Sequence, residues 1–292
     1  MKEALTYTIL IGNRVCTYDC DICISKMTYD NEIGYQKPEV NWNKFDEATE
    51  IAINYHAQNV LLTGKGEPTV YPNLMTEYLK KLFYKPFNTR ELQTNGSLIS
   101  LPNYKNYLLT WHDLGLETIA LSVYHYDNKK NENLFKPKNG KYYDIPELLG
   151  NLHNYGFKTR LSCVMLKSYI DNASEVENII QFAKTNNVEQ LTLRTADRPA
   201  EPLDILVSKF VDQNRLDAKE ENEIGSYLKS NGKLEKILTH GAPVYQINGQ
   251  NVCFTNGLDT KDKQHDGIRH LIFFPQGWLT TSWENVQGGR LL

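Results

Sequence analysis

The sequence lacks a long apolar stretch, and no segment reaches the roughly 20 apolar residues that a membrane-spanning helix needs. Residues 1–4 do not resemble the start of a signal or transit peptide. An excess of charge is also missing, because 32 Lys and Arg stand against 35 Asp and Glu, for a net charge of −3. Such a balance gives no indication of attraction to nucleic acid or to a membrane surface. We therefore expect a cytoplasmic protein with no membrane partner and no clear nucleic-acid signal.

Cysteine and histidine are scarce, and their spacing excludes several kinds of site. Five cysteines cannot all pair in disulfides, which argues against a secreted, disulfide-stapled scaffold. The seven histidines show no zinc-binding spacing, and no Gly-x4-Gly-Lys-Ser/Thr phosphate loop is present. Hydrophobic and charged shares of 40% and 23% are those of an ordinary globular protein. A length of 292 residues suffices for one large α/β domain or a core with a small appendage.

Three of the cysteines, Cys16, Cys20 and Cys23, fall close together after an apolar run, residues 5–11, that is typical of a strand. Sulfur ligands select zinc, copper(I) or iron–sulfur clusters. A closed zinc site normally needs four protein ligands, and the nearest histidine, His56, lies beyond an intervening helix pattern. The spacing favours an iron–sulfur cluster with one open coordination position. A zinc site and three buried thiols without a metal are the alternatives.

This loop resembles the Cys-x3-Cys-x2-Cys signature of the radical S-adenosylmethionine (SAM) superfamily, which follows a first strand. The resemblance implies a [4Fe-4S] cluster held by Cys16, Cys20 and Cys23, with the amino and carboxylate groups of SAM on the fourth iron. It also implies reductive cleavage of SAM to methionine and a 5′-deoxyadenosyl radical that abstracts a substrate hydrogen. Ile22 stands where many members have an aromatic residue, and an aliphatic side chain can still pack on adenine.

A second motif follows the next expected strand, residues 59–63, at the end where parallel α/β folds place ligand sites. Taken alone, this loop could be a simple turn. Beside the cysteine loop, Gly66, Glu67 and Pro68 resemble the family's Gly-Gly-Glu-Pro motif, which implies that Glu67 binds the amino group of SAM. Lys65 separates the two glycines and departs from the family pattern.

Polar residues also end the third and fourth expected strands. Gln93 and Asn95 lie in a stretch that resembles the family's Thr-Asn-Gly turn, which implies a place near SAM or the substrate. Ser122 ends the fourth strand, where the family often uses a hydroxyl to bind the ribose. A serine that merely fills the barrel is the alternative.

Two arginines lie in the fifth and sixth expected strands. By alternation, Arg160 and Ser162 share one face of the fifth strand, and Arg194 belongs to the sixth. A charge in a barrel strand is costly unless it is paired, so we expect Arg160 or Arg194 to meet a carboxylate of SAM or an anionic substrate, or to form a salt bridge at the rim. The stretch Arg194-Thr195 resembles the sixth strand of the molybdenum-cofactor cyclase branch of the family.

The remaining cysteines, Cys163 and Cys253, cannot hold a second four-iron cluster, so auxiliary clusters are expected to be absent. Buried structural thiols are the default for both. The resemblance adds a sharper hypothesis, in which Cys253 donates a hydrogen atom to a substrate radical. His125, after the fourth strand, is a candidate acid or base.

Apolar runs alternate with amphipathic segments as far as residues 198–202. Six such strand–helix units predict a parallel sheet with helices outside it, two units short of a full barrel. The expected fold class is α/β, a partial (βα)6 TIM-type barrel, which the resemblance also implies. We assign residues 1–203 to this core and residues 204–292 to a small C-terminal α+β cap. The expected strands are 5–11, 59–63, 91–94, 118–123, 159–166 and 190–195, and the expected helices are 43–56, 73–82, 104–114, 145–155 and 173–185.

Outside these units, Asn43 is expected to cap the first helix, and the Lys- and Asn-rich residues 127–141 to form a mobile loop. In the cap, Asn248-Gly249 is a hairpin turn signal. The expected elements there are a helix at 217–230, strand pieces at 244–247, 252–254 and 270–274, a turn at 275–277, and a segment at 278–283 that completes a hairpin.

For function, our first hypothesis is radical chemistry on a small-molecule or nucleotide-like substrate, with Lys65, Arg160 and Arg194 attracting an anionic group. The alternative is modification of a ribosomally made peptide, including epimerisation with a cysteine hydrogen donor, in which the cap's hairpins offer an edge to an extended substrate. A non-enzymatic metal-binding protein is the third possibility. The enzyme readings require an electron donor such as flavodoxin or ferredoxin.

Overall fold

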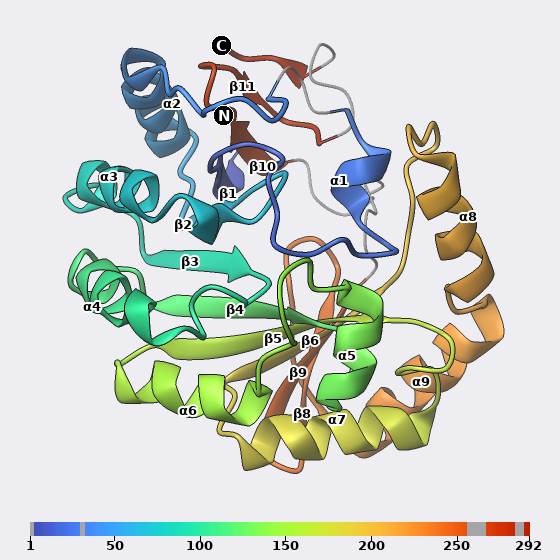
Figure 1. The fold of residues 1–292 in the computed structure, drawn as a ribbon. Coiled ribbons are helices and arrows are strands. Elements are labelled where there is room, and N and C mark those ends of the chain that lie inside the picture. The colour runs from blue at the N-terminus through green and yellow to red at the C-terminus, as the bar shows by residue number, and fades with distance from the viewer. Residues whose placement is uncertain (1–2, 30–32, 256–266, 284–288) are drawn as a thin grey trace.

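The computed structural model describes residues 3–29, 33–255, 267–283 and 289–292, and they build one twisted sheet of eleven strands (Figure 1). The six strands of the first two thirds of the chain are neighbours in chain order and run parallel. In sheet order the strands are β11 (Leu279–Thr280), β10 (Ile268–Phe273), β1 (Ala4–Leu10), β2 (Asn59–Thr63), β3 (Thr89–Thr94), β4 (Thr118–Val123), β5 (Lys158–Met165), β6 (Gln190–Thr195), β9 (Gln250–Thr255), β8 (Pro243–Ile247) and β7 (Lys233–Ile237).

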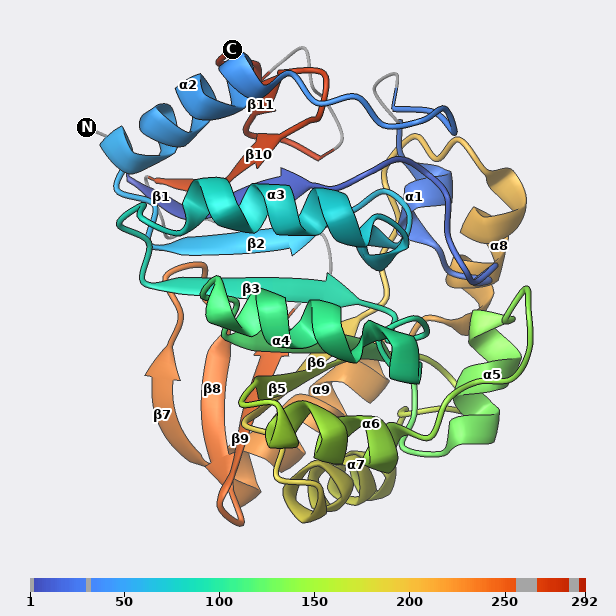
Figure 2. The ribbon, with the colours of Figure 1, turned by 60° about the vertical axis from the view of Figure 1, so that its left-hand side comes forward.

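Helices cover the outside of the parallel strands and the edge at which those strands end (Figures 1 and 2). None within the described residues is long and apolar enough to cross a lipid bilayer. The helices are α1 (Ile24–Met27), α2 (Trp42–Asn54), α3 (Pro72–Leu82), α4 (Lys105–Asp113), α5 (Asn128–Phe135), α6 (Ile145–Asn154), α7 (Ala173–Thr185), α8 (Ile205–Asn214) and α9 (Ala218–Asn231), with 3-10 turns η1 (Pro68–Val70) and η2 (Pro102–Tyr104).

The expected partial (βα)6 barrel is confirmed. β2, β4, β6 and α7 have the predicted bounds, and the other predicted core elements differ by one or two residues at their ends. The C-terminal region extends both edges of the same sheet, because β9 pairs in parallel with β6 and β10 pairs in parallel with β1. The expected turn joins β8 to β9, with positive φ angles of 51° at Asn248 and 85° at Gly249 that suit a tight hairpin. The boundary at residue 203 stays a prediction.

The expectation of a mobile loop at residues 127–141 is wrong. Asp127 caps α5 by accepting hydrogen bonds from the backbone N–H groups of Lys129 and Lys130. The charged composition hides an apolar end, since Leu134 and Phe135 are buried. The helix forms because its last turn packs into the protein, a tertiary contact that composition does not reveal.

Three smaller points differ from the sequence-based expectations. Asn41, not Asn43, caps α2, because its side chain accepts from the backbone N–H of Lys44. α8 was not expected, although Asp204 caps it with two hydrogen bonds. β7 was also missed, since all five of its residues are exposed and its sequence shows no buried face.

The two faces of the sheet differ in chemistry. The outer face carries Leu92, Ile119, Leu161 and Leu193, which join the helices in one large buried cluster. Each fully buried aliphatic side chain of this kind contributes about 1.5–3 kcal/mol. The inner face carries polar side chains at many positions, and such a face on buried strands is unusual for a parallel sheet. The functional groups of the strands therefore gather on one side.

Candidate active site

The cysteine loop follows β1 and lies at the edge where the parallel strands end, beside α1, α5 and α8 (Figure 1). Its backbone is tied to the end of α5: Asp19 N–H donates to Phe135 O at 3.0 Å, and Asp21 N–H donates to Leu134 O at 3.3 Å. Lys136 adds an ion pair with Asp21 at 2.5 Å. The segment expected to be a mobile loop thus braces the three cysteines.

The three thiols of Cys16, Cys20 and Cys23 are unpaired and partly accessible. Burial and the nearby carboxylate of Glu67 raise the pKa of Cys16 to about 11. Burial also raises the pKa of Cys20, and the other two thiols act in the same direction, which reflects how near they lie. Tyr124 hydrogen-bonds to Cys20.

An aromatic cluster lies beneath the loop. Tyr18, between the first two cysteines, has its ring centroid 5.1 Å from that of Phe135 and 6.0 Å from that of Tyr142. Phe135 also contacts Tyr124, at 4.5 Å between centroids. Such pairs contribute about 0.5–1.5 kcal/mol each beyond their burial. The cluster fixes the loop from below, while its thiols remain partly accessible.

The loop after β2 packs backbone to backbone against the cysteine loop. A Cβ atom on Gly66 would lie 2.2 Å from the carbonyl oxygen of Val15 and 2.7 Å from that of Asn13, so only glycine fits here. Directly after it, the backbone N–H of Glu67 donates to Val15 O at 3.0 Å. The close approach expected at Gly66 is therefore to the protein's own backbone, and Pro68 starts η1 behind it.

Glu67 is buried, with 3% of its surface exposed, and its carboxylate accepts four hydrogen bonds. Oε1 accepts from the backbone N–H of Thr69 at 3.0 Å and from the hydroxyls of Thr69 and Thr94, both at 2.6 Å. Among the residues that the structure describes, Oε2 accepts only from the backbone N–H of Asn95, at 2.8 Å. Burial raises the pKa of Glu67, and these hydrogen bonds partly offset the shift. Oε2 is the atom with capacity left for a ligand.

Asn95 joins the three loops. Its side-chain amide donates to Cys16 Sγ at 3.6 Å and to the Thr17 hydroxyl at 3.1 Å. Its side-chain oxygen accepts from the backbone N–H of Ser97 at 3.0 Å, which fixes the turn after β3. The expected place of Asn95 near the cofactor is thus a place beside a candidate cluster ligand.

On the inner face, Arg160 pairs with Glu91 of β3 and donates to the Thr192 hydroxyl at 3.3 Å. Arg160 thus follows the alternative expectation, a salt bridge within the protein, in the neighbourhood of Gln93, whose amide lies 3.5 Å from Glu91. Arg194, the other candidate, does not contact Glu91 in any described hydrogen bond or ion pair.

Ser122, Ser162, Thr192 and Cys253 form one row across β4, β5, β6 and β9, because each faces the next in the strand register. Cys253 is 4% exposed and lies on this inner face. Cys163 lies on the opposite face, within the main core. The strand register thus places Cys253 on the inner face, with the polar side chains, and Cys163 on the outer face, where it is part of the buried core.

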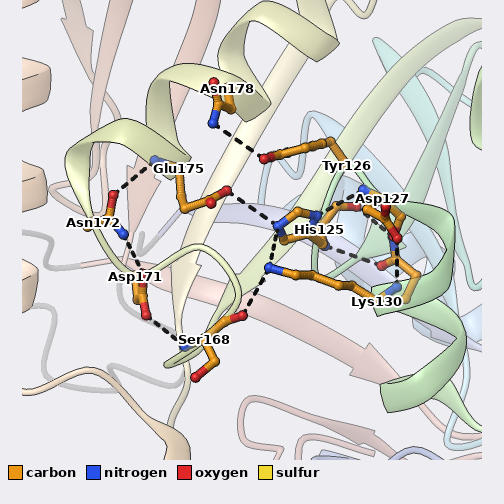
Figure 3. A network of polar contacts seen from close by, with 10 residues as sticks. His125, Tyr126, Asp127, Lys130, Ser168, Asp171, Asn172, Glu175 and Asn178 are labelled. Carbon is orange, nitrogen blue, oxygen red and sulfur yellow. Dashed lines mark hydrogen bonds and ion pairs between the residues drawn. The ribbon is translucent and has the colours of Figure 1, made fainter.

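His125 occupies a separate network outside the row just described (Figure 3). Nδ1 accepts from the backbone N–H of Asp127 at 2.9 Å, so a neutral ring carries its proton on Nε2. Nε2 lies 3.1 Å from Lys130 Nζ and 3.4 Å from Glu175 Oε2. Lys130 in turn donates to Ser168 O at 3.1 Å. The network joins the loops after β4 and β5, and burial, followed by the charge of Lys130, lowers the pKa of His125.

The residues around the cysteine loop fit a cluster and SAM. Three thiols converge from one loop, and cluster irons take thiolate ligands. No three His, Cys, Asp or Glu side chains in the described part of the chain are placed to hold a single metal ion. Next to the thiols, Oε2 of Glu67 has spare capacity to accept, and polar residues line the inner face. Both requirements of the cofactor pair, soft ligands and an acceptor for an ammonium group, are met by residues in place.

A partial parallel barrel with a three-thiol loop after its first strand is an arrangement suited to an iron–sulfur enzyme. The family model for the radical SAM superfamily matches residues 10–183, more than half of the chain. The chain therefore belongs to the radical SAM superfamily. It is an enzyme of that superfamily, and its cofactors are a [4Fe-4S] cluster and SAM.

Among proteins of similar sequence, a UPF0026 protein of Helicobacter pylori (strain ATCC 700392 / 26695) is 27% identical over 207 residues, which cover 65% of this chain and 60% of that protein. A UPF0026 protein of strain J99 / ATCC 700824 is also 27% identical, over 204 residues. The match spans about three fifths of the length of these curated relatives.

Solved structures resemble nearly the whole chain. Streptococcus suis SuiB bound to its precursor peptide SuiA is similar over 97% of this chain and 60% of that one, with 15% identity and a TM-score of 0.58. Native anSMEcpe with bound AdoMet is similar over 98% of this chain and 77% of that one, with 13% identity and a TM-score of 0.62. At these identities the likeness shows the fold.

Three contributors to the site were missed from the sequence. Tyr124 precedes His125 directly and contacts Cys20, but an aromatic residue after a strand carries no signal of its own. Lys136 could not be recognised without knowing where α5 lies, because its ion pair with Asp21 joins two segments that are distant in the chain. Glu91 was detectable, because it alternates with Gln93 on the same strand face and is the carboxylate that a barrel arginine required.

Proposed function

We propose that the chain is a radical SAM enzyme that modifies a peptide, with Cys16, Cys20 and Cys23 as the cluster ligands. The observation that supports a peptide most directly is the likeness to SuiB bound to a precursor peptide, which covers 97% of this chain and includes the strands after residue 203. In a second neighbour, native anSMEcpe with bound AdoMet and Kp18Cys peptide, the likeness covers 67% of the chain with a TM-score of 0.50.

The chain's own residues have distinct tasks in this proposal. When bound, the cluster would supply the electron that cleaves SAM to methionine and a 5′-deoxyadenosyl radical. Glu67 would accept from the amino group of SAM through Oε2, and Asn95 would hold the turn that places Cys16. Gly66 and Pro68 shape this loop, while Gln93, Ser122 and Ser162 would line the path to the substrate. An electron donor such as flavodoxin or ferredoxin completes the reaction.

The edge strand β7 gives an extended peptide a place to bind. In the described part of the chain β7 pairs only with β8 and ends the sheet, so its outer backbone groups have no partner strand there. Leu234 and Ile237 on it are 49% and 60% exposed. Peptides commonly add a strand to such an edge, where main-chain hydrogen bonds give affinity.

A small-molecule or nucleotide-like substrate is the second candidate, and it depended on three basic side chains. Arg160 is neutralised by Glu91. Lys65 is 6% exposed and donates to the Thr28 hydroxyl at 2.8 Å. Arg194 alone remains as an anion-binding group, which weakens this reading, and with it the assignment to the molybdenum-cofactor cyclase branch.

Epimerisation is the specific peptide reaction that the inner face supports. Cys253 is buried on that face, in the row with Ser162 and Thr192. In this reaction Cys253 would return a hydrogen atom to the Cα radical of the peptide, on the side opposite to the one from which hydrogen was removed. One electron from the donor and one proton from solvent then restore the thiol.

The test uses anaerobically reconstituted enzyme with reductant, SAM and short peptides encoded beside its gene. Formation of 5′-deoxyadenosine together with a peptide product supports the proposal. Cleavage of SAM that is stimulated by a nucleotide but by no peptide overturns it. Cys20→Ala should abolish cleavage, whereas Cys163→Ala, which changes a thiol on the outer face, should retain it.

Deuterium tests the role of Cys253 separately. In D2O the thiol exchanges, so epimerised product should carry one deuterium at Cα. Cys253→Ala should still cleave SAM but yield no epimerised product, and Cys163→Ala is the matched control. Full epimerisation by Cys253→Ala would contradict the assignment of this residue.

A further inference from the structure

Three arginine side chains extend from the central strands, and two of them have oxygen atoms to bind. Arg90 of β3 donates through Nη2 to the carbonyl oxygens of Leu82 and Lys85, at 2.7 and 3.2 Å. Arg160 of β5 forms an ion pair with Glu91. The positive charge of each is therefore compensated by the protein itself, and their roles are structural.

Arg194 of β6 differs from both. A buried Nε without a partner is common to all three arginines, but Arg194 also makes no hydrogen bond or ion pair through its other guanidinium nitrogens with any residue that the structure describes. Burial, followed by the positive charge of Arg160, lowers the pKa of Arg194 to about 10, whereas Glu91 acts in the opposite direction. Since Glu91 already pairs with Arg160, this part of the inner face keeps one uncompensated positive charge.

An uncompensated charge on a buried sheet face destabilises the fold, because the free-energy cost of removing the charge from water is offset only when a partner binds it. We propose that Arg194 anchors a carboxylate of the peptide substrate on the inner face, an inference that rests on the proposed function. A guanidinium group binds a carboxylate through two parallel hydrogen bonds, which fixes its orientation as well as its position. Cys253 is a neighbour of Arg194 on the same face, so the bound carboxylate would place the peptide beside the candidate hydrogen donor.

SAM also has a carboxylate, and the position of Arg194 favours the substrate as the source. The groups whose charges act on Arg194 include Glu91, Arg160 and Arg269, each within the first three residues of its strand. These strands run parallel to β1, whose far end leads into the cysteine loop. The guanidinium group of Arg194 therefore lies within electrostatic range of charged groups at the strand starts, at the end of the sheet opposite the cysteine loop.

Two capped tripeptides that differ in one charge test the anchor: acetyl-Gly-Glu-Gly-amide and acetyl-Gly-Gln-Gly-amide. Binding to the reconstituted enzyme is followed by saturation-transfer NMR, without turnover. We expect the Glu peptide to bind Arg194→Met about tenfold more weakly than wild type, the ratio for one charge-assisted pair. Equal binding by both proteins, or no preference of wild type for the Glu peptide, overturns the proposal.

The stability of the peptide-free enzyme gives an independent readout. Because Arg194 has no partner, Arg194→Met should raise the melting temperature. Arg90→Met is the matched control, and it should lower the melting temperature, because it removes hydrogen bonds to buried carbonyl groups. A lower melting temperature for Arg194→Met would show a structural charge and would contradict the proposal.

Affinity for SAM separates the two sources of carboxylate. Equilibrium dialysis of SAM against the reconstituted enzyme should give the same dissociation constant for wild type and Arg194→Met. A tenfold loss of SAM affinity, with unchanged peptide binding, would assign Arg194 to the cofactor and overturn the proposal. None of these readouts requires peptide modification, so failure of the proposed reaction and failure of this anchor are distinguishable.

Discussion

The side-chain amide of Asn95 donates to the sulfur of Cys16 at 3.6 Å, although the two residues are 79 positions apart in the chain. Through its backbone N–H, Asn95 also donates to Glu67 at 2.8 Å. The turn after β3 therefore holds both the cysteine loop and the loop after β2. The three loops at this edge of the barrel act as one unit.

Removing the amide should loosen that unit. We expect Asn95→Ala to lower the free energy of unfolding by about 1–2 kcal/mol, because the Thr17 hydroxyl loses a donor and Cys16 loses its neighbour. Iron bound per chain after reconstitution should fall as well. Asn178→Ala, which removes an exposed amide that contacts Tyr126, is the control and should change neither quantity. Equal iron content in both variants would count against the role of Asn95.

The aromatic cluster beneath the cysteine loop carries a second prediction. Phe135 is 2% exposed and contacts Tyr18 and Tyr124, so Phe135→Ala should cost about 3–5 kcal/mol of stability in urea unfolding. The thiols should also react faster with a thiol reagent under native conditions. Phe83→Ala, at a ring that is 41% exposed, is the control and should stay within about 0.5 kcal/mol of wild type. Unchanged thiol reactivity in Phe135→Ala would show that the loop holds its shape without this support.

The parallel core was predictable because each unit obeys local rules. The strand at residues 118–123 is apolar on its outer face, where Ile119, Leu121 and Val123 are buried, and α7 combines a capping residue, Asn172, with an amphipathic stripe. Short connections between such units leave few topologies, and right-handed crossovers select the barrel. The site's cysteines were predictable for a different reason, since their spacing is itself the chemical signal.

The rest depended on contacts between distant segments. α5 was missed because Leu134 and Phe135 have their partners in the cysteine loop, more than a hundred residues earlier. The edge strand β7 was missed because all five of its residues are exposed, so its sequence shows no alternation of buried and exposed positions. The four contacts of Glu67 come from residues whose positions only the folded chain defines. Sequence patterns indicate which kinds of reactive side chain the protein has. The folded structure is needed to see which of them are already bound to other groups of the protein.

The ion pair between Glu91 and Arg160 should be energetically coupled. Both side chains are largely buried, at 21% and 13% exposed. Glu91→Gln would leave Arg160 and Arg194 as two uncompensated charges, so it should cost about 2–3 kcal/mol. Arg160→Met should also destabilise, because it leaves the carboxylate alone. The double variant should be more stable than the sum of the single effects by about 1–2 kcal/mol in chemical unfolding. Additive effects would mean that the pair contributes nothing.

His125 should make stability depend on pH in a defined direction. Its folded pKa is lowered by burial and by the charge of Lys130, while Asp127 and Glu175 act against the shift. The unfolded chain therefore binds a proton at a higher pH than the folded chain. Its contribution is fully present above the unfolded pKa of about 6.5 and is lost as pH falls below that value. Geometry points the same way, since a protonated Nδ1 would face the N–H of Asp127, one donor against another.

Unfolding free energies of the metal-free protein between pH 7 and pH 5 test this for His125→Gln against wild type. The variant should be less stable than wild type at pH 7, and the gap should narrow as pH falls. His270, whose pKa burial and the charge of Arg269 lower to about 3, adds the same acid slope to both proteins and cancels in the comparison. His56→Asn, at an exposed site with a positive φ of 57° that asparagine tolerates, controls for the loss of one imidazole. A gap between wild type and His125→Gln that stays constant with pH would mean that His125 supports the fold through packing alone, and that its network with Glu175 and Lys130 does not respond to protonation.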